Sequence, residues 1–69
     1  MKIIDLINKV MNGEEMPKKV KCENLEYVWN EELHDYTNGT YLVEYLFSPM
    51  SYWDRDLKKH FNKEVEIID

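Results

Sequence analysis

Apolar residues recur at helical spacing near the start of the chain. Ile3, Leu6, Ile7, Val10 and Met11 fall three or four positions apart, so on a helix they form one apolar stripe. The stripe is followed by an Asn-Gly pair, and glycine readily adopts the left-handed conformation that ends many helices. The sequence therefore predicts a helix over residues 3–12, with its stripe facing the core.

The pattern changes to strict alternation after Pro17. In residues 18–22, Val20 and Cys22 share one side and lysines the other, and residues 25–30 alternate in the same way. Glu23-Asn24 between them fits a two-residue turn, because asparagine tolerates a positive φ. We expect a hairpin of residues 18–22 and 25–30, with a short third strand at residues 35–37.

Residues 40–47 fit two structures. As a strand, the segment would place its aromatic residues and a valine on one face. As a helix, it would begin at Thr40 and cluster Leu42, Tyr45 and Leu46. Of the two, we favour helix, ended by Ser48-Pro49.

The last part of the chain contains a second helical pattern and then an alternating one. Trp53, Leu57 and Phe61 recur at every fourth position, which predicts a helix over about residues 52–61. Val65 and Ile67 alternate with glutamates, as in a strand with one wet face. The order of elements predicts an α+β fold: a small, mostly antiparallel sheet with an N-terminal helix and a second helix packed on one side.

A chain of 69 residues forms one domain, residues 1–69, with no room for a second core. Such a domain buries only about 60% of its unfolded surface, so a homo-oligomer is a reasonable expectation. A single cysteine favours a reducing cytoplasm over a secreted disulfide scaffold. No apolar run approaches the roughly 20 residues that cross a bilayer, so we expect no membrane association.

The distribution of charge along the chain indicates which kinds of partner it can bind. The formal net charge is −5, which argues against direct binding of nucleic acid, and no lysine or arginine occurs between Lys21 and Arg55. This acidic middle also holds aromatic residues, which are favoured anchors at protein interfaces. An ordinary solvated face is the alternative. The candidate residues for binding a partner protein are Glu26, Tyr27, Trp29, Glu31, Glu32, Asp35 and Tyr36.

The chain offers little catalytic chemistry. Cys22 with His34 or His60 would be a nucleophile and base, but Cys22 lies on the predicted inward face. Asp54-x-Asp56 lacks the glycine and glutamate of a calcium loop, and there is no glycine-rich phosphate loop. We therefore expect no catalytic residues, no metal site and no cofactor.

The two ends of the chain carry a resemblance. "MKIIDLINKVMNGEEMPKKVK" and "NKEVEIID" resemble a family of short uncharacterised proteins from phages and prophages of Gram-positive bacteria. Those proteins pair an "IIDLLNKIANGEE-PKKI" segment with a terminal "DEVEII" strand; the middle of the chain does not match. The resemblance implies a phage accessory protein in the cytoplasm of an infected host bacterium, and carries over no functional residue.

These observations leave three hypotheses. The first is an inhibitor that binds the basic surface of a host anti-phage defence protein through the acidic, aromatic residues. The second is an oligomeric sponge that sequesters a nucleotide signalling molecule. Its phosphates would contact lysines or arginine and its base would stack on tryptophan, at Lys18, Lys19, Lys21, Trp29, Trp53 and Arg55. The third is a structural or regulatory phage protein.

Overall fold

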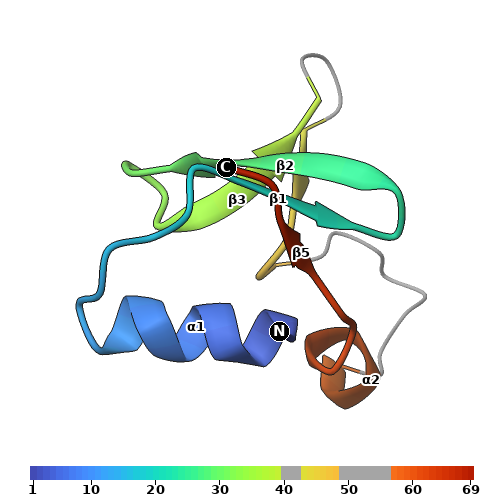
Figure 1. The fold of residues 1–69 in the computed structure, drawn as a ribbon, viewed down its shortest axis with the longest axis horizontal. Coiled ribbons are helices and arrows are strands. Elements are labelled where there is room, and N and C mark those ends of the chain that lie inside the picture. Colours follow the sequence, from blue (N-terminus) through green and yellow to red (C-terminus); the bar gives the residue numbers. More distant parts are fainter. Residues whose placement is uncertain (40–42, 49–56) are drawn as a thin grey trace.

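The computed structural model describes residues 1–39, 43–48 and 57–69. Within them, the chain forms α1 (Ile3–Met11), β1 (Lys19–Cys22), β2 (Leu25–Asn30), β3 (Asp35–Asn38), β4 (Glu44–Tyr45), α2 (Leu57–Phe61) and β5 (Glu66–Ile67). The strands make one antiparallel sheet in the order β4-β3-β2-β1-β5. Both helices lie on the same side of this sheet (Figure 1), so the predicted α+β fold is confirmed.

Helix α1 forms as its apolar stripe predicts. Ile3 and Leu6 are fully buried between the helix and the sheet, and Ile7 packs against the same core. The carboxylate of Asp5 accepts a 2.7 Å hydrogen bond from the main-chain N–H of Lys2, which satisfies a donor at the start of the helix. Burial of the stripe therefore positions α1, while Asp5 fixes where it begins.

The hairpin of β1 and β2 has the predicted boundaries to within one residue. Val20 pairs with Tyr27, and Cys22 pairs with Leu25. Glu23 and Asn24 both have positive φ, 52° and 66°, which makes the two-residue turn that matches strand twist. The predicted turn is therefore confirmed.

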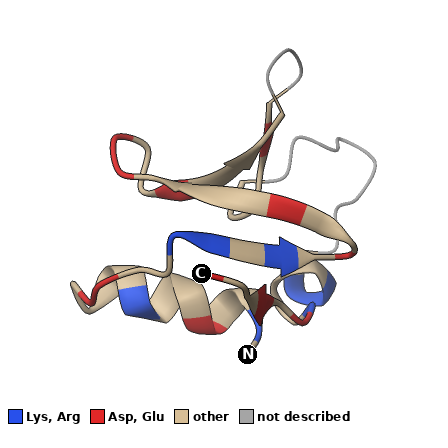
Figure 2. Ribbon diagram, turned by 45° about the horizontal axis from the view of Figure 1, so that its top comes forward, with Lys and Arg blue, Asp and Glu red and all other residues tan. Residues whose placement is uncertain are grey.

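The inner face of the sheet builds the core together with α1. Its buried apolar residues are Ile3, Leu6, Val20, Cys22, Tyr27, Tyr36, Leu46 and Val65. The opposite face carries charged residues, including Lys21 directly across from Glu26. Figure 2 shows basic positions on β1 beside an acidic position on the neighbouring strand. The sheet thus has one covered and one open face, a common arrangement for antiparallel sheets.

The structure corrects one prediction for the second half of the chain and confirms part of another. The preference for helix at residues 40–47 is wrong where the structure describes them: Glu44–Tyr45 is strand β4, because Tyr45 pairs with Thr37 of β3. Pairing with an existing strand outweighs the helical pattern of so short a segment. The second helix is confirmed at Leu57–Phe61, while residues 52–56 of the prediction lie outside the described residues.

The two ends of the chain lie against each other. The N–H of Ile3 donates to the carbonyl of Lys63 at 3.1 Å, and the N–H of Val65 donates to the carbonyl of Met1 at 2.8 Å. Strand β5 then pairs with β1, with Val20 opposite Ile67. The final strand is thus confirmed, and it closes the sheet beside the start of α1.

Candidate functional site

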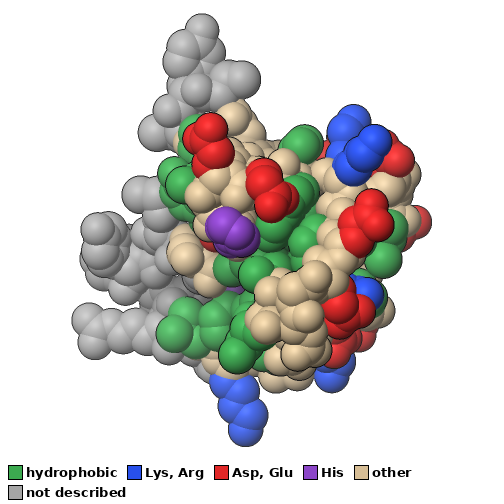
Figure 3. Space-filling model, turned by 90° about the vertical axis from the view of Figure 1, so that its left-hand side faces the viewer, with side chains coloured by type: hydrophobic (Ala, Val, Ile, Leu, Met, Phe, Trp, Pro, Cys, Tyr) green, Lys and Arg blue, Asp and Glu red, His purple; other side chains and the backbone are tan. Residues whose placement is uncertain are grey.

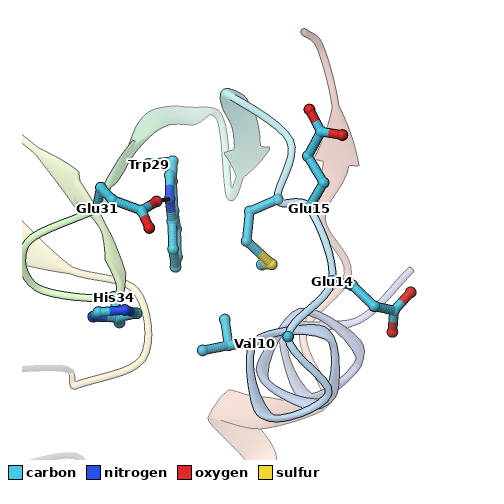
Figure 4. A pocket seen from close by; sticks show the side chains of 8 residues that line it. Val10, Glu14, Glu15, Trp29, Glu31 and His34 are labelled. Atoms are coloured by element: carbon cyan, nitrogen blue, oxygen red, sulfur yellow. Dashed lines mark hydrogen bonds between the residues drawn. The ribbon is translucent and has the colours of Figure 1, made fainter.

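An open groove lies between the end of α1 and the hairpin of β2 and β3. It has a volume of about 630 Å³, which is in the usual range for ligand-binding pockets. Figure 4 shows the indole of Trp29 facing Val10 across it, while the carboxylates of Glu14 and Glu15 point outward. The residues that line it are Val10, Gly13, Glu14, Glu15, Met16, Trp29, Glu31 and His34.

The first wall is made by the end of α1 and the segment that follows. Gly13 has a φ of +70° and donates to the carbonyl of Val10 at 3.1 Å, while Glu14 donates to the carbonyl of Lys9 at 3.0 Å. These two bonds are the Schellman arrangement that ends a helix on a left-handed glycine. The turn directs the next residues, Glu15 and Met16, along the groove.

The second wall is the indole of Trp29. Its ring contacts that of Tyr36, with centroids 5.0 Å apart and planes tilted by 59°. The imidazole of His34 meets it at a centroid distance of 6.3 Å and an interplanar angle of 89°. Trp29 is half-buried and packs against the core, so its ring is a rigid wall.

The turn between β2 and β3 brings polar groups to this wall. The side-chain oxygen of Asn30 accepts the N–H of Leu33 at 3.1 Å, and His34 adopts a left-handed φ of 53° before β3 begins. Glu31 lies at the start of the turn, and its Oε2 accepts the indole N–H of Trp29 at 2.6 Å. The carboxylate is therefore held at the edge of the indole.

The formal charges among the described lining residues are all negative. Glu14, Glu15 and Glu31 carry them, and no lysine or arginine is among the described residues that line the groove. Glu14 is partly neutralised by Lys9, whose Nζ lies 3.5 Å from its carboxylate. Figure 3 shows this face, with apolar side chains near the centre, acidic ones above and to the right of them, and Lys or Arg side chains farther out. The groove therefore combines an apolar interior with an acidic rim.

The structure brings together only part of the predicted partner-binding set. Trp29 and Glu31 line the groove, and Glu32 is exposed in the same turn. Tyr27, Asp35 and Tyr36 are only 8%, 6% and 0% exposed. These three side chains are packed into the core, so they offer little surface to a partner.

Glu26 lies elsewhere. It is exposed on β2 next to the buried Tyr27, and it faces Lys21 across the hairpin on the open side of the sheet. Its side chain therefore points away from the face that carries Trp29. We exclude Glu26 from the groove for this reason.

Asp35 has a structural role instead. Its Oδ1 accepts the N–H of Tyr36 at 2.6 Å and the N–H of Phe47 at 2.9 Å, which ties β3 to the segment after β4. Burial raises the pKa of its carboxyl group, and the main-chain N–H groups and His60 oppose the increase. Asp35 thus belongs to the interior of the fold.

The described lysines of the alternative ligand-binding set do not gather around Trp29. Lys19 and Lys21 flank the buried Val20 on β1, so they point to the open side of the sheet. Lys18 lines a separate cavity of about 440 Å³ beside Met16 and the last residues of the chain. Trp53 and Arg55 lie outside the described residues.

The candidate nucleophile and the two candidate bases lie in different surroundings. Cys22 is buried, and this burial raises the pKa of its thiol, which disfavours the reactive thiolate. His60 is buried with Nε2 2.7 Å from the carbonyl oxygen of Leu46, so this nitrogen donates to the main chain. His34 lies in the groove, beside Trp29.

Several of the residues that line the groove were not identified from the sequence: Val10, Gly13, Glu14, Glu15, Met16 and His34. Five of them belong to residues 10–16, which are far from Trp29 in the sequence. His34 is close to Trp29 in the sequence, but it was considered only as a catalytic base. The adjacent Glu14 and Glu15 after a helix stop were the available signal, but nothing in the sequence placed them opposite an indole.

No protein-family model, curated protein or solved structure matches this chain. In the part of the chain that the structure describes, no three histidine, cysteine or acidic residues gather as metal ligands would. No helix of the described residues has the length and apolar character needed to span a bilayer.

Proposed function

We propose that this chain is a non-catalytic binding protein, and that its groove receives a positively charged segment of a partner protein. The observation that carries this proposal is that Val10, Met16 and Trp29 line the groove together with Glu14, Glu15 and Glu31, the charged residues among its described lining. An anionic ligand would be repelled by this acidic rim, whereas a basic segment would be attracted.

The two parts of the groove would contribute to binding in different ways. Glu14, Glu15 and Glu31 are exposed, so their attraction acts mainly on the rate of encounter and weakens as salt rises. Trp29 offers a rigid, half-buried aromatic surface of the kind that dominates interface energetics. Charge would bring the partner in, and contact with Trp29 would slow its release.

We further propose that the partner is a host anti-phage defence protein, inhibited in the cytoplasm of an infected bacterium. The support for this setting is the resemblance of residues 1–21 and 62–69 to short phage proteins. A structural or regulatory phage protein would use the same groove on another partner.

A nucleotide sponge has less support. Lys19 and Lys21 point to the opposite side of the sheet from Trp29, so these lysines and Trp29 would not contact one nucleotide within one chain. A sponge that uses them would need a second copy to complete its site. Homo-oligomerisation itself stays a prediction.

The proposal is tested by NMR titration of the ¹⁵N-labelled protein with an acetylated, amidated Gly-Lys-Gly-Arg-Gly peptide. We expect shifts at the amides of Glu15 and Glu31 and at the indole N–H of Trp29, which shrink as sodium chloride is added. The double variant Glu15→Gln, Glu31→Gln should bind several-fold more weakly. Glu26→Gln, on the open face of the sheet, is the matched control and should bind as the parent does.

An acidic Gly-Glu-Gly-Glu-Gly peptide should leave these signals unchanged. If the basic peptide shifts no groove resonance, or if Glu26→Gln weakens it as much as the groove variant does, the proposed site is wrong.

A further inference from the structure

We propose that the groove selects arginine: a single guanidinium of the partner stacks on the indole of Trp29 and donates to the carboxylate of Glu31. This inference rests on the proposed function and specifies the side chain that the groove takes. It follows from the flat face of the Trp29 indole, from the position of Glu31 beside that ring, and from the weaker hydration of arginine compared with lysine.

The indole of Trp29 presents one face to an incoming group. The ring packs against Tyr36, and His34 lies edge-on to it, so these contacts fix its orientation. Figure 4 shows its remaining side turned toward Val10 and the side chain from the segment after α1. A flat group can therefore enter between an aromatic face and an aliphatic wall.

Glu31 supplies a carboxylate beside the ring. Its Oε2 is held 2.6 Å from the indole nitrogen, so this side chain is already oriented before a ligand arrives. Its second oxygen has no hydrogen bond or ion pair to the described residues. A guanidinium stacked on the ring keeps its N–H groups directed outward in its own plane, and it can donate to this oxygen without leaving the ring.

Glu15 belongs to the other wall, and its carboxylate is directed away from Trp29 (Figure 4). It is exposed, and no described residue forms an ion pair with it. Glu14, in contrast, already pairs with Lys9. Glu31 is thus the acceptor beside the ring, whereas Glu15 adds negative charge to the rim that attracts a cation from a distance.

Lysine fits this groove less well. Its ammonium is a compact, strongly hydrated charge that cannot lie flat on the indole, so contact with Val10, Met16 and Trp29 costs it more hydration than a planar guanidinium loses. The guanidinium is more weakly hydrated, so its flat faces give up little hydration free energy when they contact an indole and a methionine. The apolar walls therefore favour arginine even though the charge is the same.

The experiment compares three probes that differ at one position. Acetylated, amidated Gly-Gly-Xaa-Gly-Gly peptides carry arginine, lysine or the neutral isostere citrulline as Xaa. Their affinities are read from the amide shifts of Glu15, Glu31 and Gly13 in NMR titrations. We expect arginine to bind at least about threefold more tightly than lysine, as a cation–π contact at a partly exposed site allows. Citrulline should bind most weakly.

Two variants separate the contributions of stacking and charge. Trp29→Leu should remove the preference of the groove for arginine over lysine, and Trp29→Tyr, which retains an aromatic face, should keep most of it. Glu31→Gln should weaken arginine more than lysine. Because Trp29 packs against Tyr36, the dispersion of the amide spectrum of each variant verifies its fold before titration.

Equal affinities for the arginine and lysine peptides at groove resonances would overturn the arginine inference and leave the proposed function standing. Failure of both peptides to shift groove resonances would overturn both. Retention of the arginine preference in a folded Trp29→Leu variant would show that stacking is not its origin, and would also overturn the inference.

Discussion

The hydroxyl of Tyr36 donates a 2.7 Å hydrogen bond to the main-chain carbonyl of Pro17. Tyr36 is the centre of β3, whereas Pro17 belongs to the segment that joins α1 to β1. The bond therefore holds that segment, which begins with the groove residues Glu14 to Met16, against the sheet. The same ring supports Trp29 from behind, so Tyr36 positions both walls of the groove.

We expect Tyr36→Phe to lower the free energy of unfolding by about 1 kcal/mol, because the carbonyl of Pro17 loses its donor while the ring stays. Urea unfolding followed by far-ultraviolet circular dichroism measures the change. Tyr45→Phe is the control, since no described residue makes a hydrogen bond with the Tyr45 hydroxyl. Equal losses in the two variants would contradict a specific role for the bond to Pro17.

Ionisation of Tyr36 is expected to destabilise the protein at alkaline pH. Burial raises the pKa of its hydroxyl from 10.0 to about 12. The protonated form is thus favoured in the folded state, and its contribution is full below the unfolded pKa and disappears as pH rises through the folded value. Between pH 10 and 12 the parent should lose more stability than Tyr36→Phe.

The remaining alkaline loss in Tyr36→Phe should come in part from Tyr27, whose pKa burial also raises. Urea midpoints measured across this range give the comparison. Parallel curves for the parent and Tyr36→Phe would show that Tyr36 ionises as freely in the folded protein as in the unfolded chain.

Asp35 is also expected to make the free energy of unfolding depend on pH, in the acid range. Burial raises the pKa of its carboxyl group above 3.8, so the protonated form stabilises the fold below that value, and this contribution is lost as pH rises through the raised pKa. Asp35→Asn keeps an oxygen that can accept from Tyr36 and Phe47 but does not ionise.

The free energy of unfolding of the parent minus that of Asp35→Asn should therefore fall as pH increases from about 3 through the raised pKa. Other carboxylates contribute equally to both proteins and cancel in this difference. A difference that grows with pH would mean that the ionised carboxylate is the stabilising form, contrary to this assignment.

Gly13 is expected to tolerate no side chain without strain. Its φ of +70° is disfavoured for alanine, although a Cβ there would meet nothing within 4 Å. We expect Gly13→Ala to cost about 1 kcal/mol, by strain alone. Asn12→Ala, at a neighbouring exposed position with a φ of −87°, should change stability by much less. Similar costs at both positions would show that the left-handed turn is not the cause.

Much of this fold follows from short-range patterns. The stripe from Ile3 to Met11 marked α1, and alternation around Glu23-Asn24 marked the hairpin of β1 and β2. Alternation also showed that Val20 and Cys22 share a face, and both are buried. These features depend on residues that are close in sequence, so the chain itself specifies them.

The rest depends on contacts between distant segments. Alternation does not say how deeply an acidic, aromatic strand is covered, and so Tyr27, Asp35 and Tyr36 were placed on a binding surface although they are buried. Strand β4 exists because Tyr45 pairs with Thr37. The groove arises only where the turn after α1 packs opposite Trp29, which no local pattern encodes.

The pairing of the two ends of the chain sets when folding can finish. Ile3 and Met1 bond to residues 63 and 65, and Lys19 of β1 bonds to Asp69. Residues 63–69 must therefore leave the ribosome before the sheet has its last strand and α1 its neighbour. Until that moment the growing polypeptide exposes an unfinished strand edge, which neighbouring nascent chains or chaperones can bind.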